Sequence, residues 1–224
     1  MGSKIISERY SDYIDSLGAQ LPAELETLYR YAQDNQVPVI RRQTCDLLMF
    51  LLTEKRPLSI LEVGSAIGFS ALFMAAYMPS GAHITTIEKD EKRAQQAKEN
   101  FSAFQKDEEI TLLMGDAADI LETLPENGYD MIFMDAAKGQ YIRFLPRVKM
   151  LLKNGGLLVS DNVLSDGQII ESRFAVTRRN RTIHQRMRDY LFALTHDDEL
   201  VTTVLTVADG MALSVKRDNI EEKK

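Results

Sequence analysis

The chain has 224 residues, of which 45% are hydrophobic and 27% charged, and this composition fits one soluble globular domain with a full core. Its net charge of −6 excludes a surface that is basic throughout and covered by nucleic acid, although it permits a local basic patch. A single cysteine, Cys45, excludes an internal disulfide framework and a cysteine-based zinc cluster.

No stretch of the sequence has the pattern of an export or membrane signal. The first ten residues, MGSKIISERY, have no apolar core, and apolar runs such as residues 47–52 are too short to cross a bilayer. Cys45 lies in an apolar helical pattern, which favours packing over catalysis. We therefore expect a cytoplasmic protein with neither a membrane nor a DNA partner.

The first 56 residues predict a helical N-terminal cap. Residues 11–16 and 22–33 have helical patterns, and residues 42–52 are helical again after a break at 37–40, which reads Val-Pro-Val-Ile. This cap is too small to be a domain of its own. We expect one domain over residues 1–224, in which residues 162–196 form a basic insertion.

From residue 58 onward, strands and helices alternate. Helices are predicted at 69–78, 91–104, 117–124 and 140–152, and strands at 58–63, 83–88, 110–114, 129–135, 156–161, 200–206 and 211–216. Asn154-Gly155-Gly156 should end a helix and begin a strand. The short link 207–210 allows only a hairpin, so one terminal strand should run antiparallel. The expected fold is α/β, a doubly wound, Rossmann-like sheet of seven mostly parallel strands with one antiparallel strand.

A glycine turn, Gly64-Ser-Ala-Ile-Gly68, follows the first predicted strand. A strand, a glycine turn and a helix together present backbone N–H groups to a bound cofactor. The spacing is neither that of the dinucleotide fingerprint nor that of a P-loop. Glu62 is a carboxylate at the end of a buried strand, where it needs a partner, and Ser70 offers a hydroxyl in the first helical turn.

Acidic residues end the next two predicted strands. Glu88, 20 positions after Gly68, stands where a carboxylate accepts both ribose hydroxyls of a nucleoside cofactor, and it could instead be an N-cap or helix-start acid. Asp116, next to Ala117, is either a plain N-cap or an acceptor for an adenine amino group. The sequence leaves these alternatives open.

Polar residues also follow the fourth and fifth predicted strands. Asp135 begins the run DAAK, which ends in Lys138, and Asp161 is followed by Asn162. Two carboxylates and an amide oxygen at one edge of a parallel sheet suit Mg²⁺ or another hard divalent cation, unless they are only caps and a turn residue. Lys138 would be a general base beside that cation or a solvated lysine.

The basic insertion leaves the carboxyl end of the fifth predicted strand, which is the ligand side of such sheets. Residues 171–190 contain six arginines against one Glu and one Asp, a local net charge of +4. The arginines could contact RNA phosphates, or they could form a solvated helix face or a subunit contact. They are Arg173, Arg178, Arg179, Arg181, Arg186 and Arg188.

With these motifs assembled, nearly the whole chain resembles the cation-dependent class I S-adenosylmethionine (SAM) O-methyltransferases, the catechol and caffeoyl-CoA O-methyltransferase group. LEVGSAIGFS, TIEKD and GDA resemble its first three motifs, and MDAAKGQY with SDN resembles its metal signature. The resemblance implies Mg²⁺ or another divalent cation at Asp135, Asp161 and Asn162, and Lys138 as the base. The implied SAM contacts are Ile40, in a closing loop at residues 37–43, and Glu62, Gly64, Ser70, Glu88, Asp116, Ala117 and Asp135.

Within that group, VPVIRR, DAAKGQY and the arginine-rich segment are most similar to the bacterial tRNA 5-hydroxyuridine methyltransferases. This similarity implies methylation of the wobble 5-hydroxyl to 5-methoxyuridine, a tRNA anticodon stem-loop as partner, and a homodimer. RNA contacts are then expected from Arg173, Arg178, Arg179 and Arg181. Two alternatives remain: a small-molecule catechol-type O-methyltransferase, which needs the same pair of adjacent oxygens, and a non-catalytic nucleotide-binding module.

Overall fold

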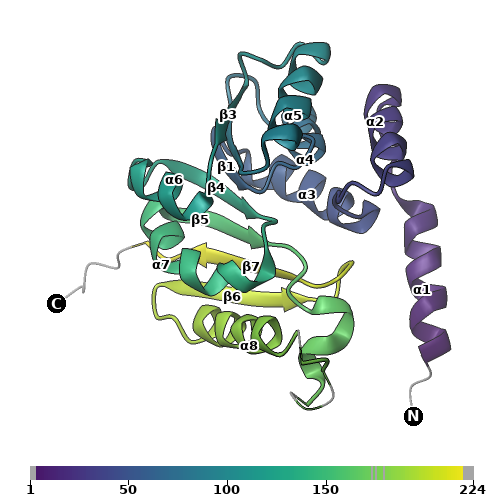
Figure 1. The fold of residues 1–224 in the computed structure, drawn as a ribbon, viewed down its shortest axis with the longest axis vertical. Coiled ribbons are helices and arrows are strands. Elements are labelled where there is room, and N and C mark those ends of the chain that lie inside the picture. The colour runs from purple at the N-terminus through teal and green to yellow at the C-terminus, as the bar shows by residue number, and fades with distance from the viewer. Residues whose placement is uncertain (1–3, 173, 175, 179, 219–224) are drawn as a thin grey trace.

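A seven-stranded sheet forms the centre of the computed structural model, which describes residues 4–172, 174, 176–178 and 180–218 (Figure 1). The strand order is β3-β2-β1-β4-β5-β7-β6. The strands are β1 (Ser59–Val63), β2 (His83–Glu88), β3 (Ile110–Met114), β4 (Tyr129–Met134), β5 (Leu152–Ser160), β6 (Leu200–Leu205) and β7 (Met211–Lys216). The first five strands are parallel, and β7 runs antiparallel to both β5 and β6. The predicted fold class is confirmed.

Helices cover both faces of the sheet because successive strand residues are buried on opposite sides. Ile60, Met131 and Leu157 pack with α2 (Ala23–Asp34), α3 (Arg42–Lys55), α4 (Phe69–Tyr77) and α5 (Glu91–Ala103). Their neighbours Leu61 and Ile132 pack against the second group of helices, α6 (Ala117–Thr123), α7 (Tyr141–Leu151) and α8 (Arg181–Thr195). Strands that are apolar on both faces are typical of a doubly wound parallel sheet.

The predicted N-terminal cap is helical, but its first helix is longer than the pattern indicated. α1 spans Lys4–Leu17 and extends away from the sheet (Figure 1), whereas α2 and α3 pack against α4. Cys45 on α3 is buried, and burial raises the pKa of its thiol to about 12, so the predicted packing role is confirmed. Among the described residues, no helix combines the length and the apolar character that a membrane span requires.

One strand prediction was wrong in detail, and the prediction of one antiparallel terminal strand is confirmed. β5 begins at Leu152, so Asn154-Gly155-Gly156 lies inside a strand rather than between a helix and a strand. The reason is a register shift opposite Tyr129 and Met131, which Gly155 accommodates with φ of 67°. The antiparallel strand β7 is the last in sequence, but it inserts between β5 and β6, so β6 forms the sheet edge.

The basic insertion contains a 3₁₀ segment, η2 (Ser165–Ile170), which precedes α8. A second 3₁₀ turn, η1 (Lys138–Gln140), lies outside the insertion, between β4 and α7. α8 packs against η1, α7 and η2. The insertion therefore lies beside the chain segment that follows Asp135.

Candidate functional site

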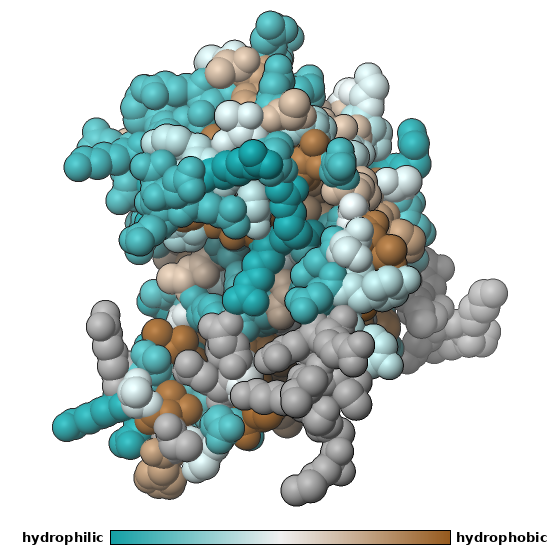
Figure 2. All heavy atoms as spheres, turned by 90° about the vertical axis from the view of Figure 1, so that its right-hand side faces the viewer, coloured by the Kyte–Doolittle hydropathy of each residue, from teal (hydrophilic) through white to brown (hydrophobic). Residues whose placement is uncertain are grey.

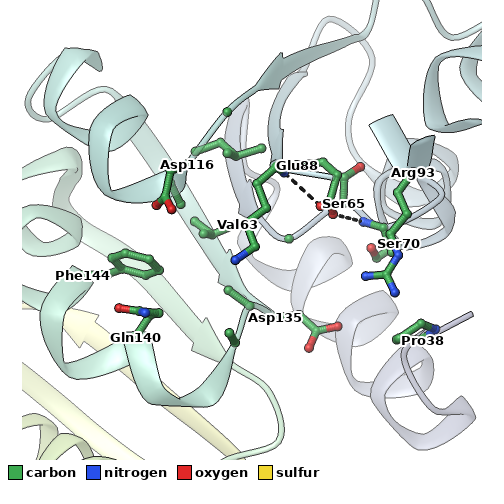
Figure 3. Close-up of a pocket in the computed structure, with 18 of the residues that line it drawn as sticks. Pro38, Val63, Ser65, Ser70, Glu88, Arg93, Asp116, Asp135, Gln140 and Phe144 are labelled. Atoms are coloured by element: carbon green, nitrogen blue, oxygen red, sulfur yellow. Dashed lines mark hydrogen bonds between the residues drawn. The ribbon is translucent and has the colours of Figure 1, made fainter. Parts of the chain in front are cut away.

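A cavity of about 530 Å³ opens at the carboxyl ends of β1, β2, β3 and β4 (Figure 3). This volume lies in the range of small-molecule sites. The glycine turn, the end of β2, the start of α6 and the segment after Asp135 all contribute to its wall, and the loop before α3 adds Pro38, Val39 and Ile40. Of the eight residues predicted to contact SAM, seven line this cavity: Ile40, Gly64, Ser70, Glu88, Asp116, Ala117 and Asp135.

The glycine turn is shaped by close backbone approach. Gly64 has φ of 106°, and a Cβ there would lie 2.2 Å from the carbonyl oxygen of Asp135. Gly68 has φ of 85°, and a Cβ there would lie 2.4 Å from the ring of Phe101. Both positions therefore require glycine. The turn brings the ends of β1 and β4 together at the cavity wall.

Three backbone N–H groups fix the carboxylate of Glu88 (Figure 3). Ala66 donates to Oε2 over 2.9 Å, and Lys89 and Asp90 donate to Oε1 over 2.9 and 2.8 Å. Asp90, not Glu88, is the N-cap of α5, since its side chain accepts from the backbone N–H of Arg93. The N-cap alternative for Glu88 is wrong, and its buried carboxylate is held in one orientation at the cavity.

Asp116 is an N-cap and also lines the cavity. Its Oδ1 accepts the backbone N–H of Ala118 over 2.9 Å at the start of α6. The side chain is otherwise exposed, so it can accept a second hydrogen bond from a ligand. The capping role is confirmed, and a contact to adenine stays a prediction.

Glu62 lies behind the cavity wall rather than in it. Thr86 Oγ1 donates to its Oε2, while Oε1 has no hydrogen-bond partner among the described residues. Complete burial raises the pKa of Glu62 to about 7, although the hydroxyls of Ser70 and Thr86 favour the charged form. Glu62 thus supports Ser70 from behind, and direct contact between Glu62 and a cofactor stays a prediction.

The three predicted metal ligands converge at the ends of β4 and β5. Asn162 donates its side-chain amide to Oδ1 of Asp135 over 3.1 Å and its backbone N–H to Oδ1 of Asp161 over 2.7 Å. Thr44 on α3 donates to Oδ2 of Asp161 over 3.4 Å. The parallel pairing of Met134 with Ser160 places the two aspartates side by side.

The electrostatics of this pair suit a cation. Burial raises the pKa of Asp135 to about 7, and the negative charge of Asp161 adds to the effect. Burial also raises the pKa of Asp161 to about 6, against the hydrogen bond from the Asn162 backbone. A divalent cation would remove this cost by neutralising both carboxylates.

The donor set is a small one. No cluster of three or more His, Cys, Asp or Glu side chains suited to a metal occurs in the described part of the chain. A cation here would therefore be held by Asp135, Asp161 and the side-chain oxygen of Asn162. A half-turn of the Asn162 side-chain amide would present its oxygen to the cation. The residues fit Mg²⁺, which keeps positions open for water and substrate oxygens.

Lys138 is ion-paired rather than solvated. Its Nζ lies 2.9 Å from Oδ2 of Asp209, whose side chain is 3% exposed. Asp209 belongs to the link between β6 and β7. The interpretation of Lys138 as a freely solvated lysine is therefore wrong.

Several arginines of the basic insertion hold the segment together. Arg181 donates to the carbonyl of Val176, Arg186 to that of Gly139 and Arg188 to that of Ile169. Arg178 is exposed, and Arg173 and Arg179 lie outside the described residues. The structure therefore assigns part of the arginine signal to internal contacts.

Sequence reasoning missed several cavity residues. Gln140, Arg143 and Phe144 line the cavity from the segment after DAAK. Their spacing of three and four positions puts them on one helical face, and this signal could have found them. Ser65, Ala66 and Arg93 also line the cavity. Asp209 carried no local signal because only the tertiary fold brings it to Lys138.

Known proteins match both the sequence and this geometry. The sequence model of the O-methyltransferase family matches residues 15–217, a range that includes every described site residue discussed above. The chain belongs to the O-methyltransferase family. Its enzymatic class is therefore the transfer of a methyl group to an oxygen atom.

The relatives of this O-methyltransferase share its length and fold. A catechol O-methyltransferase from Niastella koreensis is 32% identical over 162 residues, which cover 70% of this chain and 72% of the relative. A candidate caffeoyl-CoA O-methyltransferase from Staphylococcus aureus has a TM-score of 0.84 and 32% identity, covering 94% of this chain and 99% of its own. A methyltransferase from Podospora anserina, at 24% identity and a TM-score of 0.85, covers 97% of this chain and 100% of its own and shows the fold.

Proposed function

We propose that this O-methyltransferase uses SAM and a divalent cation to methylate a hydroxyl that has a second oxygen beside it. The observation that carries the proposal is the double position of Asp135. This residue lines the cavity and also accepts a hydrogen bond from Asn162 in the carboxylate pair. A methyl donor in the cavity and an acceptor at the carboxylates would therefore be neighbours, as methyl transfer requires.

The chain offers the groups that SAM needs. SAM supplies a methyl group on a positively charged sulfur. Glu88, at the end of β2, presents a fixed carboxylate for a ribose, and Asp116, at the start of α6, presents one for an adenine amino group. Solved structures of the same fold support this cofactor, because that of the Podospora anserina methyltransferase contains SAH.

The chain also offers groups to activate the acceptor. A divalent cation, when bound, lowers the pKa of a coordinated hydroxyl and fixes its orientation. Asp135, Asp161 and Asn162 would hold that cation. Lys138 would accept the proton of the hydroxyl. The hydroxyl oxygen can then attack the methyl carbon in line with the bond between that carbon and sulfur.

A small catechol is the first candidate substrate. Its two adjacent oxygens match a hard-cation site with open positions, and relatives from Niastella koreensis and Mycobacterium tuberculosis are named catechol O-methyltransferases. The second relative is 29% identical over 163 residues. A catechol needs no basic surface outside the cavity.

The 5-hydroxyuridine at the wobble position of tRNA is the second candidate substrate, with 5-methoxyuridine as product. The specific observation in its favour is the basic insertion, where Arg178 is exposed and the guanidinium of Arg181 lies 5.9 Å from the ring of the exposed Phe174. Arginine and an exposed aromatic ring suit phosphates and an unstacked base. Like a catechol, 5-hydroxyuridine has two adjacent oxygens.

One experiment tests the chemistry and separates the substrates. The enzyme is incubated with methyl-labelled SAM and Mg²⁺, with and without EDTA, and offered a catechol, the matching monophenol, tRNA containing 5-hydroxyuridine, or tRNA lacking it. Label in catechol but not in monophenol, lost with EDTA, supports the first candidate. Label in hydroxyuridine-containing tRNA at a higher rate supports the second. Equal labelling with EDTA present would overturn the cation-assisted mechanism.

A further inference from the structure

The link between β6 and β7, residues 206–210, is hydrogen-bonded to two segments beside the reaction site. The backbone N–H of Leu164 donates to the carbonyl of Asp209 over 2.9 Å, and that of Val163 donates to Gly210 over 3.0 Å. Ala208 donates its N–H to the side chain of Gln43 over 2.8 Å. The link is thus bound to the segment after Asn162 and to the start of α3.

The backbone of this link is held in one conformation. Gly210 has φ of 84°, and a Cβ there would lie 2.2 Å from the side chain of Leu164. Ala208 also has a positive φ, of 51°, which is uncommon for a residue with a side chain. These features and the hydrogen bond from Leu164 fix the backbone position of Asp209.

The side chain of Asp209 points from this fixed backbone to Lys138. Oδ2 lies 2.9 Å from Nζ, the carboxylate is 3% exposed, and the lysine is 29% exposed. A buried carboxylate with a fixed backbone limits where a flexible four-carbon lysine side chain can place its amine.

We propose that Asp209 is a positioning residue, which holds the amine of Lys138 at the reaction site. The inference rests on the proposed role of Lys138 as base. In that step Lys138 begins as the neutral amine. The O–H bond of the acceptor breaks and an N–H bond forms on Lys138, which becomes an ammonium group. The oxygen keeps the electron pair of the O–H bond and attacks the methyl carbon. The carbon–sulfur bond then breaks, and its electron pair stays on sulfur. Asp209 stays a carboxylate and stabilises the ammonium group.

A double-mutant cycle tests the link between the two residues. The variants are Lys138→Met, Asp209→Asn and the double variant, each assayed with saturating SAM and Mg²⁺. Lys138→Met should lower kcat by about 10²-fold or more, as loss of a general base does. Asp209→Asn should lower kcat by about 10-fold, with SAM affinity unchanged, because the charge-assisted hydrogen bond is lost. The double variant should be no slower than Lys138→Met, because Asp209 acts through the lysine.

Controls separate positioning from general destabilisation. Asp197→Asn breaks a comparable salt bridge, Lys149 to Asp197 at 2.6 Å, and should leave kcat unchanged. Asp209→Glu keeps the charge and the hydrogen-bond acceptor and should restore part of the rate that Asp209→Asn loses. Tm and SAM binding are measured for every variant, so that an unfolded variant is recognised. If Asp209→Asn does not fold, Asp209→Glu tests the positioning role.

The outcomes distinguish failure of the proposed base from failure of the positioning role. Unchanged kcat in Lys138→Met would overturn the proposed base, and the positioning role with it. A large loss in Lys138→Met with losses that multiply in the double variant would overturn only the positioning role. An Asp209→Glu variant as slow as Asp209→Asn would overturn it as well.

Discussion

Asn162 donates its side-chain amide to Oδ1 of Asp135 over 3.1 Å, although the two residues follow different strands and are 27 positions apart. This contact joins the end of β4 to the end of β5 and completes a group with Asp161. Burial raises the pKa of both carboxylates, and the negative charge of Asp161 adds to the shift at Asp135, so the group is poorly stabilised without a cation.

We predict that a divalent cation stabilises the folded chain through these residues. Mg²⁺ at 100 times its Kd should add about 2.7 kcal/mol to the free energy of unfolding, which raises Tm by roughly 5–10 °C for a domain of this size. Thermal unfolding with Mg²⁺ and with EDTA measures the effect. Asp161→Asn should abolish it, and Asp189→Asn, on the exposed side of α8, should not. A rise of equal size in Asp161→Asn would place the cation elsewhere.

Gly64→Ala should damage the cavity because the added Cβ would meet the carbonyl of Asp135. The expected cost is about 3 kcal/mol or more in the free energy of unfolding, with loss of SAM binding. Gly81→Ala is the matched control, since Gly81 also has a positive φ, of 81°, but nothing lies within 4 Å of its added Cβ. It should cost only about 1 kcal/mol and keep SAM affinity. Chemical denaturation and calorimetric titration give both quantities, and equal costs would contradict the steric argument.

Glu62 should make the free energy of unfolding fall as pH rises from about 4.5 through about 7. Burial raises its folded pKa to about 7, above the unfolded value of about 4.5, so the stabilisation present below pH 4.5 is lost as pH rises through 7. Glu62→Gln removes this titration and should be more stable than the wild type at pH 8 by up to about 3 kcal/mol, but not at pH 4. Urea unfolding across this range checks the sign. A difference that does not change with pH would show that Glu62 titrates normally.

The exposed apolar side chains of α1 predict a homodimer. Tyr10, Tyr13, Ile14 and Leu17 are 57–66% exposed, and α1 extends from the sheet (Figure 1). Figure 2 shows the face turned to this side as mainly hydrophilic, with apolar side chains in separate groups. The exposed apolar face of α1 is expected to be covered by a second copy of the chain.

Ile14→Glu combined with Leu17→Glu should convert the dimer to a monomer, because two charges would be buried in the interface. Light scattering after size-exclusion chromatography measures the mass. Val201→Glu, on the exposed edge strand β6, is the comparison and should leave the dimer intact. Dissociation by Val201→Glu instead would place the interface on the sheet edge.

The alternation of apolar runs and helical segments was sufficient to predict the sheet, because a strand that is buried on both faces is a nearly continuous run of apolar residues. The glycine turn and the aspartates were also predictable, since the carboxyl ends of adjacent parallel strands meet at one edge. Local pattern failed where pairing decides the outcome. β7 inserts between β5 and β6, and β5 begins before its glycines, because hydrogen bonding to distant strands sets position and register.

The sequence by itself determined the fold class, the family and the acidic residues at the strand ends, because these follow from periodicity and from residue type at short spacing. Only the tertiary structure decided their partners. It placed Glu62 behind Ser70, gave three arginines to internal carbonyls and paired Lys138 with Asp209 across 71 positions. Contacts between segments so far apart depend on how the elements pack together, and local sequence does not specify this packing.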